Sequence, residues 1–273
     1  MTSSTDPGFG RWLAALDERH LANLTQSEVT RALRALSSCY VERREKLASG
    51  GPLDSAGKRA AFALFYAPMH FLVTREIVLA LAAAGGTKRI VDLGCGTGSA
   101  GAAFALEADA RVEGVDRNNW AVSEANWTYG TMGIAGRAAV GPIQRTRLAG
   151  APGTTILAAY AVNELPDADR DALLPRLVDA TQRGSRILVI EPIARRINRW
   201  WENWRDALSA RDDEWRFRVV LPARQRTLAK AAGLDPQELT ARSLYFEAPA
   251  PSRTGGDASD SESQKSEVRI EKP

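Results

Sequence analysis

A glycine-rich turn between an apolar strand and an alanine-rich helix is the feature of this sequence that most limits its fold. The turn lies within Arg89-Ile-Val-Asp-Leu-Gly-Cys-Gly-Thr-Gly-Ser-Ala-Gly101. Ile90, Val91 and Leu93 have the apolar character of a buried strand, and the glycines remove the β-carbons that would keep ligand atoms away from the turn. A strand that enters a helix through such a turn predicts a doubly wound α/β fold that binds a nucleoside cofactor.

A second apolar strand follows the turn and ends at an acidic residue. The strand is Arg111-Val-Glu-Gly-Val115, and Asp116 comes directly after it, 22 residues past Gly94. A carboxylate at this point of a doubly wound fold can accept hydrogen bonds from both ribose hydroxyls of an adenosine. We therefore expect Asp116 to bind the sugar of the cofactor.

This arrangement resembles the class I S-adenosylmethionine-dependent methyltransferases. The residues that match the pattern D-x-G-x-G-x-G and the acid after the next strand are Asp92, Gly94, Gly96, Gly98 and Asp116. The resemblance implies that S-adenosylmethionine is the cofactor, that Asp92 and the glycine backbone hold its methionine end, and that Asp116 holds the ribose. The other candidate cofactor-binding residues, which lie near these elements, are Cys95, Arg117, Ile143 and Ala159.

A nicotinamide-dependent dehydrogenase is the competing interpretation, because its fingerprint is also glycine-rich. The spacing here is G-C-G-T-G rather than G-x-G-x-x-G, and Asp92 would repel a pyrophosphate placed at the helix N-terminus. Both features favour a methyltransferase.

The length of 273 residues is sufficient for one large α/β domain with an appendage. We predict an N-terminal helical extension at 1–84, a methyltransferase domain at 85–248 and a disordered tail at 249–273, where Ser, Gly, Asp, Glu and Lys dominate. In the extension, Ser27 is the expected cap of one helix, and Pro68 implies two helices or a kink between residues 60 and 84.

The pattern from residue 89 onward is that of a mostly parallel sheet wrapped by helices. The strands are predicted at 89–93, 111–115, 137–140, 154–160, 185–191, 215–221 and 242–247. The helices are predicted at 99–108, 119–132, 167–182, 195–211 and 225–232. Seven strands match the Rossmann-like methyltransferase fold, and the resemblance implies that the last one is antiparallel.

Composition limits the other functional classes. No stretch approaches the roughly 20 apolar residues that span a bilayer, and the N-terminus lacks a basic region followed by an apolar run. Cys39 and Cys95 are too few for a metal cluster and are consistent with a reducing compartment, so we expect no metal site and a cytoplasmic protein. Cys95 is more typical of a small filler in the turn than of a nucleophile.

The candidate catalytic residues follow the fourth predicted strand, because ligands of open parallel sheets gather at the carboxyl ends of the strands. They are Tyr160, Asn163 and Glu164. Asn163 could hydrogen-bond an amide-like acceptor or cap the next helix, and Glu164 could accept a proton or pair with a surface arginine. His70 could be a general base or a structural residue.

A second resemblance concerns the ribosome-associated methyltransferase-like family of the mitochondrial small subunit and its bacterial relatives. It is carried by Ala159-Tyr-Ala-Val-Asn-Glu-Leu165, Arg170 and Ile187-Leu-Val-Ile-Glu-Pro192. This resemblance implies a ribosomal role. The chain lacks the cysteine set that binds an iron–sulfur cluster in many of those proteins.

Residues 183–230 contain twelve Arg or Lys and six Asp or Glu, together with Trp200, Trp201, Trp204 and Trp215. Basic groups interleaved with aromatics can bind RNA, whereas tryptophans at helical spacing can simply form a buried stripe. Three functions therefore stay open: methylation of rRNA or a ribosomal component, N- or O-methylation of a small molecule in a pocket closed by the N-terminal helices, and non-catalytic cofactor binding by an assembly factor. The acceptor and the oligomeric state are not predicted.

Overall fold

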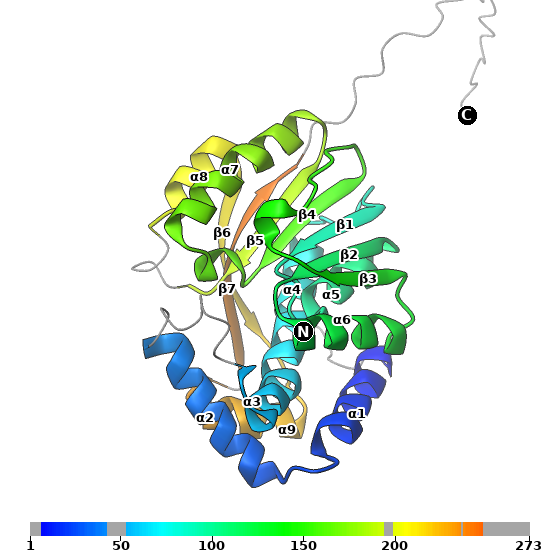
Figure 1. The fold of residues 1–273 in the computed structure, drawn as a ribbon, viewed down its shortest axis with the longest axis vertical. Helices are drawn as coiled ribbons and strands as arrows, with labels where there is room; N and C mark the ends of the chain where they lie inside the picture. Colours follow the sequence, from blue (N-terminus) through cyan, green and yellow to red (C-terminus); the bar gives the residue numbers. More distant parts are fainter. Residues whose placement is uncertain (1–6, 43–52, 194–198, 236, 248–273) are drawn as a thin grey trace, which may run out of the picture.

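The computed structural model describes residues 7–42, 53–193, 199–235 and 237–247 (Figure 1). The strands are β1 (Arg89–Leu93), β2 (Arg111–Asp116), β3 (Gly136–Val140), β4 (Thr154–Ala159), β5 (Arg186–Glu191), β6 (Arg211–Arg218) and β7 (Glu238–Phe246). The α-helices are α1 (Pro7–Leu21), α2 (Gln26–Glu42), α3 (Ala56–Ala61), α4 (Ala67–Ala80), α5 (Ser99–Ala108), α6 (Asn119–Thr131), α7 (Asp167–Gln182), α8 (Trp201–Leu208) and α9 (Ala223–Ala231). Short helical turns are η3 (Phe62–Tyr66), η4 (Ile143–Arg145) and η5 (Val162–Glu164).

All seven strands form one sheet in the order β3-β2-β1-β4-β5-β7-β6. Strands β1 to β5 pair in parallel, and β7 pairs antiparallel with both β5 and β6. The predicted fold class, a Rossmann-like methyltransferase sheet with N-terminal helices, is confirmed. Because the strand order reverses between β1 and β4, the carboxyl ends of these two strands mark the crevice where ligands bind in such sheets.

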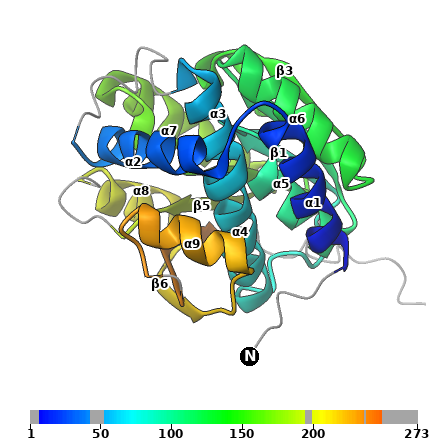
Figure 2. The ribbon, with the colours of Figure 1, turned by 90° about the horizontal axis from the view of Figure 1, so that it is seen from below.

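Two apolar cores lie on opposite faces of the sheet. Ile90 and Leu188 belong to the core that α4, α5 and α6 cover, whereas their neighbours Val91 and Val189 belong to the core that α7 and α8 cover. The N-terminal helices extend the first core: α1 contacts η3 and α6, and α2 packs against both α3 and α9 (Figure 2). This places α1 beside the half of the sheet that contains β1, β2 and β3, where the cofactor is expected to bind.

The helical run Ala56–Ala80 is long and apolar enough to cross a membrane, which corrects the expectation that no stretch of that kind exists. It serves here as a core element, because 61% of its most apolar window is buried inside the fold. Pro68 is accommodated in the first turn of α4, where a proline removes no needed hydrogen bond. The five residues before α4 form a π-helix, η3, so the expected irregularity lies just before the proline.

Several predicted boundaries were wrong; strand β7, for example, begins at Glu238 rather than at 242. The cap of α2 is Thr25 rather than Ser27, since Thr25 and Glu28 exchange hydrogen bonds in a capping box. Helix α8 begins at Trp201 and ends at Leu208, before Ser209 in the left-handed conformation, whereas 195–211 was predicted. Residues 195–198 of the predicted helix lie outside the described residues. Strand β6 begins at Arg211 rather than 215, because its charged first half pairs with β7 as a partly exposed strand. The predicted tail at 249–273 also lies outside the described residues, and the domain boundaries stay predictions.

Candidate cofactor and acceptor site

The turn after β1, called here the glycine loop (residues 94–98), adopts a backbone that favours glycine. Gly94, Gly96 and Gly98 have φ values of 70°, 53° and 78°. A β-carbon at Gly94 would lie 2.6 Å from Cβ of Ala161. At Gly96, the nearest atom beyond the chain neighbours would be Cζ of Phe62, at 4.0 Å. The first glycine thus permits close packing, and the space over Gly96 is bounded by a ring from the N-terminal segment.

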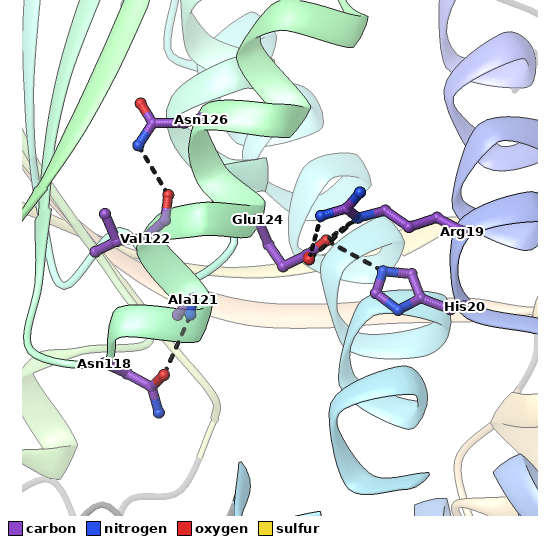
Figure 3. Close-up of polar contacts among 7 residues, drawn as sticks. All are labelled: Arg19, His20, Asn118, Ala121, Val122, Glu124 and Asn126. Atoms are coloured by element: carbon purple, nitrogen blue, oxygen red, sulfur yellow. Dashed lines mark hydrogen bonds and ion pairs between the residues drawn. The ribbon is translucent and has the colours of Figure 1, made fainter. Parts of the chain in front are cut away.

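Asp116 links the end of β2 to the glycine loop. Its Oδ2 accepts a hydrogen bond from the backbone N–H of Gly96 at 3.0 Å, and its Oδ1 accepts one from Asn118 at 2.8 Å. Asn118 in turn caps α6 by accepting hydrogen bonds from the N–H groups of Trp120 and Ala121, the second of which is drawn in Figure 3. Each carboxylate oxygen has a further lone pair, so Asp116 has acceptor capacity for two ribose hydroxyls.

Asp92 lies beneath the glycine loop and is 1% exposed. Its Oδ2 faces the first turn of α5, where a β-carbon at Gly101 would come within 2.5 Å of it. Burial and the charge of Asp116 raise the pKa of Asp92 to about 7, and the N–H of Gly101 lowers it only in part. Neither oxygen makes a full hydrogen bond within the described part of the chain. Asp92 is therefore buried against the first turn of α5, a placement that the resemblance alone did not reveal.

The other candidate cofactor residues differ in placement. The side chain of Cys95 is buried against Gly114, and burial raises the pKa of its thiol, as suits a filler and not a nucleophile. Ile143, in η4, packs over Gly94, where its Cδ1 would lie 3.3 Å from a β-carbon. Ala159 is buried at the end of β4, and Arg117 is exposed after Asp116. The described residues contain no cluster of three His, Cys, Asp or Glu side chains suited to a metal.

Tyr160 stands at the exit of β4 in a left-handed conformation with φ of 58°. A bulky residue rarely adopts this backbone, and such outliers are concentrated at functional sites. Its N–H donates to the carbonyl of Ile190 at 2.8 Å, and its ring stacks on His70 with centroids 3.8 Å apart and planes 10° from parallel. Burial and the nearby Glu191 raise the pKa of the Tyr160 hydroxyl, so it stays protonated at neutral pH.

Asn163 is part of a buried network rather than a cap of α7. Its side-chain Nδ2 donates to Glu191 at 2.8 Å, its backbone N–H donates to the other oxygen of Glu191 at 3.0 Å, and its Oδ1 accepts from Nε1 of Trp200 at 3.0 Å. Glu191 ends β5 and is 1% exposed. Burial is the main reason that the pKa of Glu191 is raised to about 8, and the charge of half-buried Glu164 adds to it.

Sequence reasoning gave Glu191 no role beyond a resemblance motif. The signal that could have found it is an acid at the end of a buried parallel strand next to β4. Glu191 orients Asn163 and so shapes the exit of β4.

Aromatic rings from the N-terminal segment converge on this exit. The aromatic cluster consists of Phe62, Tyr66, His70, Trp120 and Tyr160. Phe62 connects the cluster to the glycine loop, since it is the ring that bounds the space over Gly96. All five side chains are half-buried, and the first two lie in the π-helix η3. π-Helical turns are rare and are often found at functional sites.

Glu124 joins the N-terminal helices to the cofactor half of the fold (Figure 3). It is 4% exposed on α6 and accepts hydrogen bonds from Arg19 at 2.9 to 3.1 Å; His20 lies 3.1 Å away. Hydrogen bonds from His20 and Arg19 outweigh desolvation and lower the pKa of Glu124. The guanidinium of Arg19 also lies over the ring of Trp127. The buried carboxylate therefore fixes α1 against α6.

Half of the twelve basic residues of 183–230 form ion pairs within the described part of the chain. The six arginines that pair with Asp or Glu are Arg183, Arg186, Arg205, Arg211, Arg216 and Arg224. Trp201 and Trp204 are 0% and 1% exposed, and Trp215 donates a hydrogen bond to Ser243. Core packing, one of the two readings left open for the tryptophans, accounts for Trp201 and Trp204.

Residues 90–184 match the family model described as "Methyltransferase domain". This segment, about a third of the chain, is similar to methyltransferase domains. It contains the glycine loop, Asp116 and the exit of β4, and S-adenosylmethionine is the cofactor that it indicates. The ribosome-associated subfamily that the second resemblance suggested is not confirmed.

Two solved structures illustrate the similarity. A TehB-like SAM-dependent methyltransferase from Corynebacterium glutamicum is 16% identical with a TM-score of 0.43, over 79% of this chain and 99% of that one. The N-methyltransferase NodS from Bradyrhizobium japonicum, in complex with S-adenosyl-L-homocysteine, is 14% identical with a TM-score of 0.46, over 67% of this chain and 89% of that one. No curated protein matches the sequence.

The residues present fit this cofactor. The glycine loop leaves open space over Gly96, Asp116 has lone pairs for two hydroxyls, and Ile143 offers an apolar contact at the same edge. The arrangement can therefore hold a nucleoside.

Proposed function

We propose that the chain is an S-adenosylmethionine-dependent methyltransferase whose acceptor is a small molecule. The acceptor would bind between the N-terminal helical segment and the exit of β4. The observation that carries this proposal is the aromatic cluster, which connects the glycine loop through Phe62 to His70 and Tyr160. Pockets lined by rings with few polar groups suit compact ligands.

The cofactor supplies a sulfonium methyl group when bound. The chain would bind its ribose through Asp116 and its methionine end through the backbone of the glycine loop. Tyr160 would orient the acceptor, because its strained backbone and its stack on His70 fix the ring at the strand exit. Asn163 would act as a positioning residue held by Glu191, and Glu164 is the remaining polar side chain of this exit.

A compact acceptor is favoured over RNA because half of the basic groups that could contact RNA already have acidic partners. Six arginines of the 183–230 region have acidic partners, and Trp201 and Trp204 are inside the core. RNA binding needs cations that can exchange counterions and rings that can stack on bases.

The experiment uses S-adenosylmethionine with a tritium-labelled methyl group and a bacterial extract separated into low-mass compounds and RNA. We expect enzyme-dependent label in the low-mass fraction, and its loss with Asp116→Ala. Label in RNA would overturn the small-molecule acceptor. Saturable cofactor binding without label in either fraction would overturn catalysis and favour a cofactor-binding assembly factor.

A further inference from the structure

We propose that His70 binds the methyl acceptor, and that the acceptor is an aromatic hydroxyl compound whose O–H donates a hydrogen bond to the imidazole. This inference rests on the proposed function and names the substrate class of the same site. It depends on where His70 lies, on the state of its ring nitrogens and on the rings around it.

The first observation is the position of His70 between two unusual backbone features. It lies on α4, one helical turn after the π-helix η3, and its ring stacks on Tyr160, whose φ of 58° is strained. The π-helix and the left-handed strand exit are far apart in the sequence, yet they meet at this ring pair. Structural packing alone would not need both.

The second observation is that the imidazole has unused hydrogen-bonding capacity. Within the described part of the chain, no residue hydrogen-bonds to His70, and its ring nitrogens are not among the fully buried polar atoms without partners. The side chain is half-buried, so the ring is not sealed from solvent. The stack occupies one face of the ring and leaves the edge, where the nitrogens lie, for a ligand.

The third observation concerns charge. Desolvation lowers the pKa of His70 to about 3, so the imidazole is neutral at physiological pH and offers one acceptor nitrogen. A neutral ring does not repel a sulfonium cation. A single acceptor nitrogen matches a group with one proton to donate, such as a hydroxyl.

The walls of the site indicate the rest of the acceptor. Phe62 and Tyr66 lie 6.1 and 6.0 Å from His70 between ring centroids. Flat apolar surfaces of this kind complement a planar ring, by offset stacking or edge contacts. An aromatic hydroxyl satisfies both the rings and the single acceptor nitrogen.

The proton balance is consistent with this role. As an oxygen lone pair forms the bond to the methyl carbon, the carbon–sulfur bond breaks and its electron pair stays on sulfur. The acceptor oxygen becomes strongly acidic at that stage, so even a weakly basic imidazole can take the hydroxyl proton and pass it to water.

The test observes His70 directly and does not depend on turnover. The chain has only two histidines, so ¹⁵N-histidine labelling gives few ring signals, and His20→Gln assigns those of His70. The protein is first saturated with S-adenosylhomocysteine and then titrated with phenol. Anisole is the matched probe, because it keeps the ring and the oxygen but has no proton to donate.

We expect phenol, but not anisole, to move the unprotonated ring nitrogen of His70 in the direction of hydrogen-bond acceptance, with saturation. An unchanged His70 signal at saturating S-adenosylhomocysteine would overturn the inference and leave the proposed function standing. Equal shifts with anisole would also overturn it. Failure of S-adenosylhomocysteine to bind at all would instead overturn the proposed function.

Discussion

Replacement of Asp116 by alanine should remove most of the affinity for S-adenosylmethionine. The carboxylate already accepts hydrogen bonds from Gly96 and Asn118, and its remaining lone pairs are free for two ribose hydroxyls. Hydrogen bonds to a charged group contribute about 1.5–3 kcal/mol each. Two of them correspond to about 3–6 kcal/mol, or roughly 10²- to 10⁴-fold in Kd.

Thermal unfolding converts this loss into a shift of Tm. At a ligand concentration of about 100 times the wild-type Kd, binding stabilises the native state by about 2.7 kcal/mol. For a chain of this size, about 2–4 °C per kcal/mol gives a rise of roughly 5–11 °C. A 100-fold weaker variant at the same concentration gains only about 0.4 kcal/mol, or about 1 °C.

The comparison must use the shift that ligand causes, because Asp116→Ala also removes two acceptors from the loop and lowers the Tm of the free protein. Asp171→Ala is the matched control, since Asp171 is an exposed acid on α7. NAD provides the second ligand. A full shift in Asp116→Ala, or an equal shift with NAD, would refute the assignment of Asp116 to the ribose of a sulfonium nucleoside.

Three further predictions concern stability and are checked by denaturant unfolding. Glu124→Gln should lower the free energy of unfolding by about 1–3 kcal/mol. Because the pKa of Glu124 is lowered in the folded state, the ionised carboxylate stabilises the fold above the unfolded value near 4.5, and this stabilisation is lost as pH falls. The variant should therefore lose less stability than the wild type on acidification. An equal loss of stability at low pH would contradict this prediction. Gly98→Ala should cost about 1–3 kcal/mol, because φ is 78° and the new Cβ would lie 2.8 Å from the ring of Tyr129. Gly130→Ala is the matched control: no atom lies near its new Cβ, so it should stabilise the fold by roughly 0.5–1 kcal/mol. Equal effects of the two substitutions would refute the geometry of the loop. The pKa of Glu191 is raised to about 8 in the folded state, so its contribution to the free energy of unfolding falls as pH rises from about 4.5 to 8. In Glu191→Gln, the free energy of unfolding should depend less on pH over this range. The same pH dependence in both proteins would count against a buried acid.

The central part of the fold could be predicted because its signals are local. The predicted bounds are those of the structure for the strand Arg89–Leu93 and the helices Ser99–Ala108 and Asp167–Gln182. For the strand, the reason is that a buried parallel strand is a continuous apolar run with sharp ends. Strand β6 was displaced because it is amphipathic and charged: Asp212 pairs with Arg242 of β7, and only tertiary pairing identifies such a segment as a strand.

Some residues of the candidate site could likewise be predicted from local spacing, whereas others are brought together only by the tertiary structure. The three glycines and Asp116 lie within one β-α-β unit, so their spacing alone brings them together. The stack of His70 on Tyr160 joins residues that are 90 positions apart, and no pattern in the sequence pairs them. The buried state of Glu191 likewise depends on which strand is adjacent to β4, which only the sheet order decides.

The N-terminal helices therefore supply one wall of the site as well as covering the sheet. Glu124 holds α1 on α6, and α1 packs against η3, which carries Phe62 toward the glycine loop. Asp116 ends β2, and the loop joins β1 to α5; neither needs α1 for its hydrogen bonds. A substitution that loosens α1 should consequently weaken acceptor binding more than cofactor binding. The reverse result would mean that the aromatic cluster stabilises the cofactor and not the acceptor.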